Sequence, residues 1–395
     1  MKSLQTASLF SGIGGVELGL SRAGHETKFF CEFEPGAQEV LKTRFPDIPL
    51  HSDVLNLKRL PKGTELLTAG FPCQDLSQAG ETRGIRGARS GLVGEVFRLL
   101  RTHDIPNVLL ENVPFMLQLE RGKAMRMITS EFEELGYKWA YRVLDSRAFG
   151  LPQRRQRVFF YASREVDPSE LLFAEDVGMP EVETPNGRAC GFYWTEGLRG
   201  LGWAVDGVPT LKGGSSIGIP SPPAIWFPDG RIATPELRDA ERLQGFRSDW
   251  TKPAEKVSRA SHRWKLVGNA VSVNTAKWFG QKIRLKPKSL KFMPLPFDQQ
   301  RSWPVAAFGS RESGRFEAPV STWPKCSPVK PLEEFLIYDT KPLSHRAVTG
   351  FLNRLNRSSL RYPEEFYRAL IRHQEHMADH APTKGKISNK IVKSN

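Results

Sequence analysis

The chain has 395 residues, of which 39% are hydrophobic and 10% aromatic, so it can bury a core and is not disordered throughout. No apolar run approaches the roughly 20 residues of a membrane helix, and the first residues lack the apolar core of a signal peptide. The four cysteines (Cys31, Cys73, Cys190 and Cys326) are too scattered for a disulfide framework or a CxxC-type metal site, which fits a reducing, cytoplasmic setting. A net charge of +14 favours a polyanionic partner.

Most of this charge lies near the C-terminus. Residues 281–395 hold 21 lysines and arginines against 10 acidic residues, which is +11 of the total. Two interpretations stay open: a solvated tail, expected at least for 383–395, or a surface that contacts a nucleic-acid backbone.

The first 165 residues alternate between strand-like and helix-like segments. Short apolar runs indicate strands, and Val93, Val96, Phe97 and Leu100 have the i, i+3, i+4, i+7 spacing of a helix. Such alternation predicts a doubly wound, mostly parallel α/β sheet. The expected strands are 6–10, 27–31, 66–69, 107–111 and 158–162.

The pattern changes after Arg164. Residues 165–230 are rich in glycine and proline and read as irregular structure. Thr234-Pro235-Glu236 then predicts a helix start, with Thr234 as the N-cap, and Gly245 its end. A last helix is expected after Pro363.

The segment Phe10-Ser11-Gly12-Ile13-Gly14-Gly15 joins the first strand to a helix, and Glu32 follows Gly12 by 20 residues. Glycines let a ligand approach the backbone, and an acid at that distance can hold ribose hydroxyls. The spacing is not GxGxxG, so an adenosine cofactor without a pyrophosphate fits better. Phe33 could lie against the adenine and Asp53 could reach its amino group; the alternative is an ordinary tight turn.

Two further motifs follow strands. Cys73, in Gly70-Phe71-Pro72-Cys73-Gln74, and Glu111, in Glu111-Asn112-Val113-Pro114, would reach the same edge of a parallel sheet. A lone cysteine is more often a buried apolar residue than a nucleophile, but its place at this edge favours a functional role. A carboxylate that leaves a buried strand needs a partner or a function.

A basic run, Gln153-Arg154-Arg155-Gln156-Arg157, precedes another strand. Alternation along a strand would point Arg155 and Arg157 the same way. One of them could reach the site, or the run could contact phosphates.

Together these four motifs resemble, in their order, those of the cytosine-C5 DNA methyltransferases. Glu241-Arg242-Leu243-Gln244-Gly245-Phe246 and Gly268-Asn269-Ala270-Val271 are similar to two late motifs of the same family, and the resemblance covers about residues 4–280. It implies an α/β, doubly wound, Rossmann-like S-adenosylmethionine-dependent catalytic domain and a smaller irregular target-recognition domain.

The resemblance implies roles for individual residues. Cys73 would add to C6 of a flipped-out cytosine, Glu111 would hold a proton at N3, Arg157 would contact the O2 side, and Arg155 would help to fix the pocket. The loop Gln74–Gly91 would close over DNA through Gln74, Ser77, Arg83, Arg86 and Arg89. The S-adenosyl-L-methionine residues would be Phe10, Gly12, Gly14, Glu32, Phe33, Asp53, Val54, Pro72, Leu92, Asn269 and Val271.

The expected organisation is a catalytic domain of 1–164 plus 264–285, a DNA-reading domain of 165–263 and a basic extension of 286–395. The expected protein is a DNA (cytosine-5-)-methyltransferase of a restriction–modification system, and its expected partner is double-stranded DNA. We expect a cytoplasmic monomer without a metal. A cognate restriction endonuclease is implied, without direct contact. The alternatives are a tRNA cytosine-C5 methyltransferase and a catalytically inactive DNA-binding regulator. The segment Ser221-Pro222-Pro223-Ala224 matches the motif of exocyclic-amine methyltransferases only in part, which argues against that class. The incomplete glycine pattern argues against a nicotinamide oxidoreductase.

Overall fold

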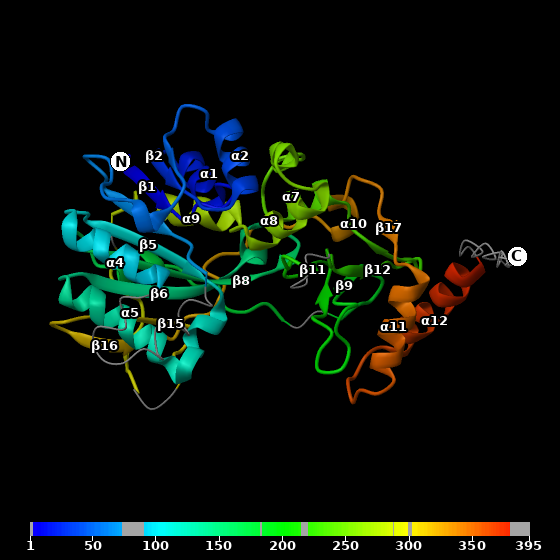
Figure 1. Cartoon of the computed structure of the whole chain (residues 1–395). Coiled ribbons are helices and arrows are strands. Elements are labelled where there is room, and N and C mark those ends of the chain that lie inside the picture. The colour runs from blue at the N-terminus through cyan, green and yellow to red at the C-terminus, as the bar shows by residue number, and fades with distance from the viewer. Residues whose placement is uncertain are drawn as a thin grey trace, which may run out of the picture.

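A ten-stranded sheet forms the centre of the larger part of the molecule (Figure 1). The structure is a computed structural model that describes residues 3–72, 91–181, 184–214, 220–286, 288–298 and 302–379. The strand order is β14-β16-β15-β6-β8-β5-β4-β1-β2-β3. The strands are β1 (Gln5–Leu9), β2 (Glu26–Cys31), β3 (Leu50–His51), β4 (Leu66–Ala69), β5 (Asn107–Asn112), β6 (Lys138–Asp145), β8 (Gln156–Ser163), β14 (Leu295–Pro296), β15 (Ala306–Ser310) and β16 (Gly314–Glu317).

Half of this sheet has the parallel arrangement that the strand–helix alternation predicts. Strands β3, β2, β1, β4 and β5 pair in parallel. The remaining pairings, from β5–β8 to β14–β16, are antiparallel. The α/β fold class is confirmed, and the sheet is mixed because β8 follows β6 through a short connection that contains no crossover helix.

Helices cover both faces of the sheet because successive strand residues point to opposite sides. In β5, Val108 and Leu110 share a core with residues of α4 and α5, whereas Leu109 shares the other core with residues of α1 and α9. The predicted helix around Val93–Leu100 is confirmed as α4. The helices of this part are α1 (Gly15–Arg22), α2 (Pro35–Arg44), α4 (Leu92–Thr102), α5 (Lys123–Glu134), α6 (Pro168–Leu172), α8 (Arg263–Asn269) and α9 (Val273–Lys282), with 3₁₀ turns η1 (Val54–Asn56), η3 (Pro114–Leu117), η4 (Leu119–Gly122), η5 (Ser146–Phe149), η6 (Lys252–Lys256) and η7 (Ala260–His262).

A second, five-stranded sheet lies beside the first, in the order β10-β9-β12-β13-β17 (Figure 1). Its strands are two or three residues long, which is why the stretch after Arg164 shows weak periodicity. The strands are β9 (Cys190–Phe192), β10 (Ala204–Val205), β12 (Ala224–Trp226), β13 (Ile232–Thr234) and β17 (Lys341–Pro342); a further pair, β7 (Gln153–Arg154) and β11 (Val208–Pro209), joins the two regions.

The segment after residue 286 contributes to both sheets. Strand β15 pairs with β6 in the large sheet, and β17 pairs with β13 in the small one. Helices α10 (Leu332–Phe335), α11 (His345–Leu355) and α12 (Glu364–Asp379) follow, and the last confirms the helix expected after Pro363. Phe351 and Phe366 pack against Phe192 of β9, so α11 and α12 cover the small sheet (Figure 1).

Helix α7 (Leu237–Leu243) starts later than its sequence predicts. Thr234 was expected as the N-cap, but it ends strand β13, and the side chain of Glu236 caps the helix by accepting from the backbone N–H of Arg238. The expected end is confirmed, since Gly245 follows the C-cap with φ of +88°.

The domain boundaries at residues 164, 263 and 285 stay a prediction, and the expected solvated tail, 383–395, lies outside the described residues. No helix within the described ranges is long and apolar enough to cross a membrane.

Candidate active site

The loop after β1 has an unusual backbone conformation. Phe10, Gly12 and Gly14 all have positive φ, at +55°, +55° and +79°. Glycine adopts this conformation without steric cost, and Cβ at Gly12 would meet no atom within 4 Å. The space beside Gly12 is therefore open to a ligand.

Glu32, at the end of β2, holds this loop. Its Oε2 accepts from the N–H of Gly12 at 2.7 Å, and its Oε1 accepts from the N–H of Glu34 at 2.8 Å. Burial raises the pKa of Glu32, whereas these two hydrogen bonds lower it. The sequence does not predict this contact between Glu32 and the glycine loop, and the expected role of Glu32 toward ribose hydroxyls stays a prediction.

A cavity of about 460 Å³ opens beside the loop, at the carboxyl ends of the parallel strands. Phe33 is 76% exposed, so its ring offers an uncovered aromatic face, and Asp53 accepts from the backbone N–H of Leu55 at 2.9 Å. Nine of the eleven predicted cofactor residues line the cavity: Phe10, Gly12, Glu32, Phe33, Asp53, Val54, Pro72, Leu92 and Asn269.

The other two predicted cofactor residues lie next to this cavity. Gly14 caps helix α1, and Cβ there would come within 2.7 Å of the Phe45 ring. Val271 lines a smaller neighbouring cavity of about 50 Å³, which also contains Glu111. Gly14 therefore shapes the loop, while Val271 borders the space between the large cavity and Glu111.

Glu111 and Arg157 form an ion pair at the end of β5. The Nε atom of Arg157 lies 3.1 Å from Oε1 of Glu111, and both side chains are nearly buried. Burial raises the pKa of Glu111, while the charges of Arg157 and Arg155 act in the opposite direction. Such a carboxyl group can take up a proton at a pH where an exposed glutamate stays ionised.

Arg155 is fully buried and acts through the backbone. It donates to the carbonyl oxygens of Leu211 at 3.1 Å, Gly268 at 3.1 Å and Ala270 at 2.6 Å. These bonds fix the end of α8, which carries Asn269, beside the cavity. Arg155 thus contacts backbone carbonyls while Arg157 pairs with Glu111, and the expected help of Arg155 in fixing the pocket stays a prediction.

Six predicted site residues lie outside the described residues. They are the nucleophile candidate and the five predicted DNA contacts: Cys73, Gln74, Ser77, Arg83, Arg86 and Arg89. Their flanking residues Pro72 and Leu92 both line the large cavity.

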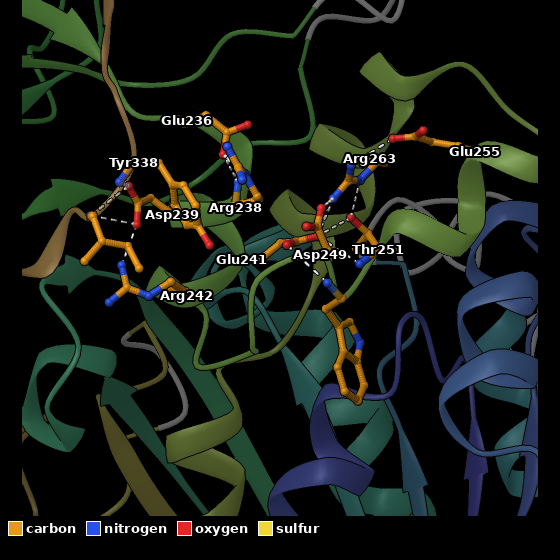
Figure 2. A network of polar contacts seen from close by, with 12 residues as sticks. Glu236, Arg238, Asp239, Glu241, Arg242, Asp249, Thr251, Glu255, Arg263 and Tyr338 are labelled. Atoms are coloured by element: carbon orange, nitrogen blue, oxygen red, sulfur yellow. Dashed lines mark hydrogen bonds and ion pairs between the residues drawn. The ribbon is translucent and has the colours of Figure 1, made fainter.

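The structure adds residues that no motif singles out. The indole N–H of Trp250 donates to the carbonyl of Ile13 at 2.9 Å, and Ile13 lines the cavity. The buried carboxylate of Glu241 holds this segment through the N–H groups of Trp250 and Thr251 and through Arg263, at 2.8 to 3.2 Å (Figure 2). The only sequence signal for this network is that Glu241 lies in a family-like motif.

Glu17 is a second unpredicted residue. It is 1% exposed, and its Oε1 accepts from the hydroxyls of Ser8 at 2.6 Å and Thr68 at 3.1 Å. It lines the small cavity together with Glu111. Burial raises its pKa, so this carboxyl group holds its proton more tightly than an exposed glutamate.

Comparison with known proteins agrees with this geometry. Residues 4–188 match the family described as C-5 cytosine-specific DNA methylase. The chain is 45% identical to the type II methyltransferase M2.BsuMI of Bacillus subtilis over 93% of this chain and 98% of that protein, so the match includes most of the segment after 286. It is 25% identical to M.HhaI of Haemophilus parahaemolyticus over 74% of this chain and 97% of that protein.

A solved structure, the Dnmt2 methyltransferase of S. pombe, shares the fold. The TM-score is 0.50 at 16% identity, and the match covers 70% of this chain and 96% of that one. The fold, the cavity and the near full-length relative lead to one assignment: the chain belongs to the C-5 cytosine-specific DNA methylase family and is a DNA cytosine-C5 methyltransferase.

Proposed function

We propose that the chain methylates C5 of a cytosine in duplex DNA, and that the reaction takes place at the edge of the large sheet where Glu111 and Arg157 lie. The observation that carries the proposal is this buried ion pair. Its Glu111 lines a small cavity that shares residues with the large cavity lined by the predicted cofactor residues. A flipped-out base needs a pocket with a hydrogen-bonding group for its Watson–Crick edge, and Glu111 is such a group.

The large cavity fits S-adenosylmethionine. Its volume of about 460 Å³ is in the range of ligand pockets. The carboxylates of Glu32 and Asp53 retain lone pairs for hydroxyl or amino groups, and the exposed ring of Phe33 can stack on an aromatic base. When bound there, S-adenosylmethionine supplies the methyl group for C5.

The proposed mechanism uses Cys73 as the nucleophile. Its thiolate forms a bond to C6 of cytosine, the electron pair of the C5=C6 double bond moves to form C4=C5, and the C4=N3 pair moves onto N3. A proton from Glu111 at N3 prevents charge from accumulating there, and Arg157 holds the carboxyl group in place. The C4=C5 pair forms the bond from C5 to the methyl group, C4=N3 is restored, and N3 returns its proton to Glu111. Loss of the C5 proton to solvent and of the Cys73 thiolate then restores the C5=C6 double bond.

The assignment of Cys73 rests on the motif Gly70-Phe71-Pro72-Cys73-Gln74 and on Pro72, which lines the cavity. The alternative of a catalytically inactive DNA-binding regulator is disfavoured, because the side chains of Glu111 and Arg157 form an ion pair. The matching family is described as a DNA methylase, and the near full-length relative is named a type II methyltransferase, so the alternative of a tRNA methyltransferase is not favoured.

We further propose a role in a type II restriction–modification system, with a mark that protects host DNA from a paired endonuclease. The support is the 45% identical relative, which is named a type II methyltransferase.

The test is methyl transfer from labelled S-adenosylmethionine to duplex DNA and, in parallel, to tRNA, followed by bisulfite sequencing of the DNA. The expected result is protected cytosines within one short recurrent sequence. Label in tRNA alone, or label in DNA without bisulfite protection, would contradict the proposal.

A further inference from the structure

A groove runs along helix α9, separate from the cofactor cavity. One hollow of about 260 Å³ lies against Phe149 and Asn274, and another of about 540 Å³ lies against Arg22 and Arg284. Both are lined by Trp278, Gln281 and Lys325. The shared residues show that the two hollows are neighbours, and together they are here named the α9 groove.

The α9 groove is strongly basic. Arg22, Lys277, Lys282, Arg284 and Lys325 line it, whereas Glu175 is its one acidic lining residue. Glu175 pairs with Lys282 at 2.6 Å. Lys277 and Lys325 have no ion-pair partner among the described residues, so their charges face the groove uncompensated. Part of the C-terminal charge excess is therefore gathered in the α9 groove.

A buried donor in the groove also lacks an acceptor. Trp278 is 4% exposed, and its Nε1 has no hydrogen-bond partner within the described part of the chain. A buried N–H without an acceptor is costly, and a ligand oxygen would relieve that cost. The uncompensated ammonium groups of Lys277 and Lys325 are suited to the oxygen atoms of an anion.

One end of the groove lies at the catalytic edge of the large sheet. Strand β6 ends at Asp145, which pairs with Gln156, one residue before Arg157 of the catalytic ion pair. The turn η5 follows directly and ends at Phe149, whose carbonyl accepts from Asn274 at 2.9 Å. The groove thus begins where target DNA is proposed to lie and leads away from it.

We propose that the α9 groove binds the phosphate backbone of the DNA that flanks the target site. This inference rests on the proposed function, because it needs DNA at the catalytic edge. Helix α9 has ten residues and is about 15 Å long, a length over which one strand of B-DNA carries about four phosphates. The groove would add affinity that is independent of sequence and sensitive to salt.

The test compares two double variants on two duplexes. Lys277→Gln with Lys325→Gln removes the two uncompensated charges, and Lys58→Gln with Lys62→Gln removes two exposed charges that line neither hollow. One duplex spans about one helical turn around the target and the other about three turns. The readout is the dissociation constant as a function of salt concentration.

On the long duplex, the slope of log K against log salt concentration should be shallower for the groove variant than for wild type by about 1.8. Each of the two lost phosphate contacts removes about 0.9 from this slope. On the short duplex it should match wild type, and the control variant should match wild type on both. A wild-type slope for the groove variant on the long duplex would overturn the inference, as would an equal loss on both duplexes. Wild-type methyl transfer to the short duplex reports separately on the proposed function.

Discussion

Arg157 and Glu111 meet at 3.1 Å across the antiparallel pair of β5 and β8, and this contact closes the catalytic edge of the sheet. The pairing brings together a carboxyl group and a guanidinium group that are 46 positions apart in the sequence. The ion pair therefore lies where the parallel half of the sheet meets the antiparallel half.

The ion pair predicts how Glu111→Gln behaves. Glutamine cannot deliver a proton to N3, so the single-turnover rate of methyl transfer should fall by about a hundredfold or more. In the proposed mechanism Glu111 acts in its protonated form, and burial raises its pKa. The wild-type rate should therefore fall as pH rises through that raised pKa, and the variant should lose this titration. A pH series of single-turnover rates checks both points; near-normal turnover would remove Glu111 from the mechanism.

Glu32→Ala should weaken the cofactor site without changing DNA affinity. The substitution takes the acceptor from the N–H groups of Gly12 and Glu34, and it removes the carboxylate proposed to hold ribose hydroxyls. We expect the dissociation constant of S-adenosylmethionine, measured by calorimetry, to rise about tenfold or more. An unchanged constant would show that Glu32 is not a ligand of the cofactor.

Trp250→Phe tests a second contact that supports the glycine loop, the hydrogen bond from Trp250 to Ile13. Phenylalanine keeps the aromatic packing against Phe45 and Phe246 but removes the donor to the Ile13 carbonyl. Loss of one such bond corresponds to about 1 kcal/mol, so cofactor affinity should fall about fivefold. The matched control is Trp226→Phe, which lies in the small sheet and should leave cofactor affinity unchanged. Equal cofactor affinities for the two variants would contradict this role.

Glu17→Gln should change how stability depends on pH. Burial raises the pKa of Glu17 above its ordinary value of 4.5, so the folded state binds this proton more tightly than the unfolded state. Wild-type stability is therefore lost as pH rises from 4.5 through the raised pKa. Glutamine can still accept from Ser8 and Thr68 but does not titrate, so the variant should lose less unfolding free energy over that window. Chemical denaturation at several pH values checks this, and parallel curves for the two proteins would contradict it.

Sequence alone predicts four of the five strands in the parallel half of the sheet, β1, β2, β4 and β5, whereas the two-residue strand β3 has no signal of its own. Strand β5, helix α4 and the glycine loop have strong local signals: a continuous apolar run, a helical stripe, and glycines placed between a strand and a helix. The spacing of 20 residues between Gly12 and Glu32 is typical of one strand–helix–strand unit and singles out Glu32, but it does not predict the hydrogen bond between them.

The remainder depends on long-range contacts that leave no local pattern. Strand β15 reads Ala306-Ala-Phe-Gly-Ser and finds its partner, β6, more than 160 residues earlier. The small-sheet strands are too short for a period of two to be visible, and β17 comes from the far end of the chain. Trp250 could not be assigned to the cofactor loop, since only the folded chain brings it to Ile13.

The central claim is covalent catalysis by Cys73, and trapping tests it most directly. A target duplex whose cytosine carries fluorine at C5 allows addition and methyl transfer but blocks release, because fluorine cannot leave as a proton does. With S-adenosylmethionine present, mass spectrometry should find a stable enzyme–DNA adduct on the peptide that contains Cys73, and the Cys73→Ser variant should bind cofactor but form none. No adduct with an active wild-type enzyme, or an adduct on another residue, would contradict the account.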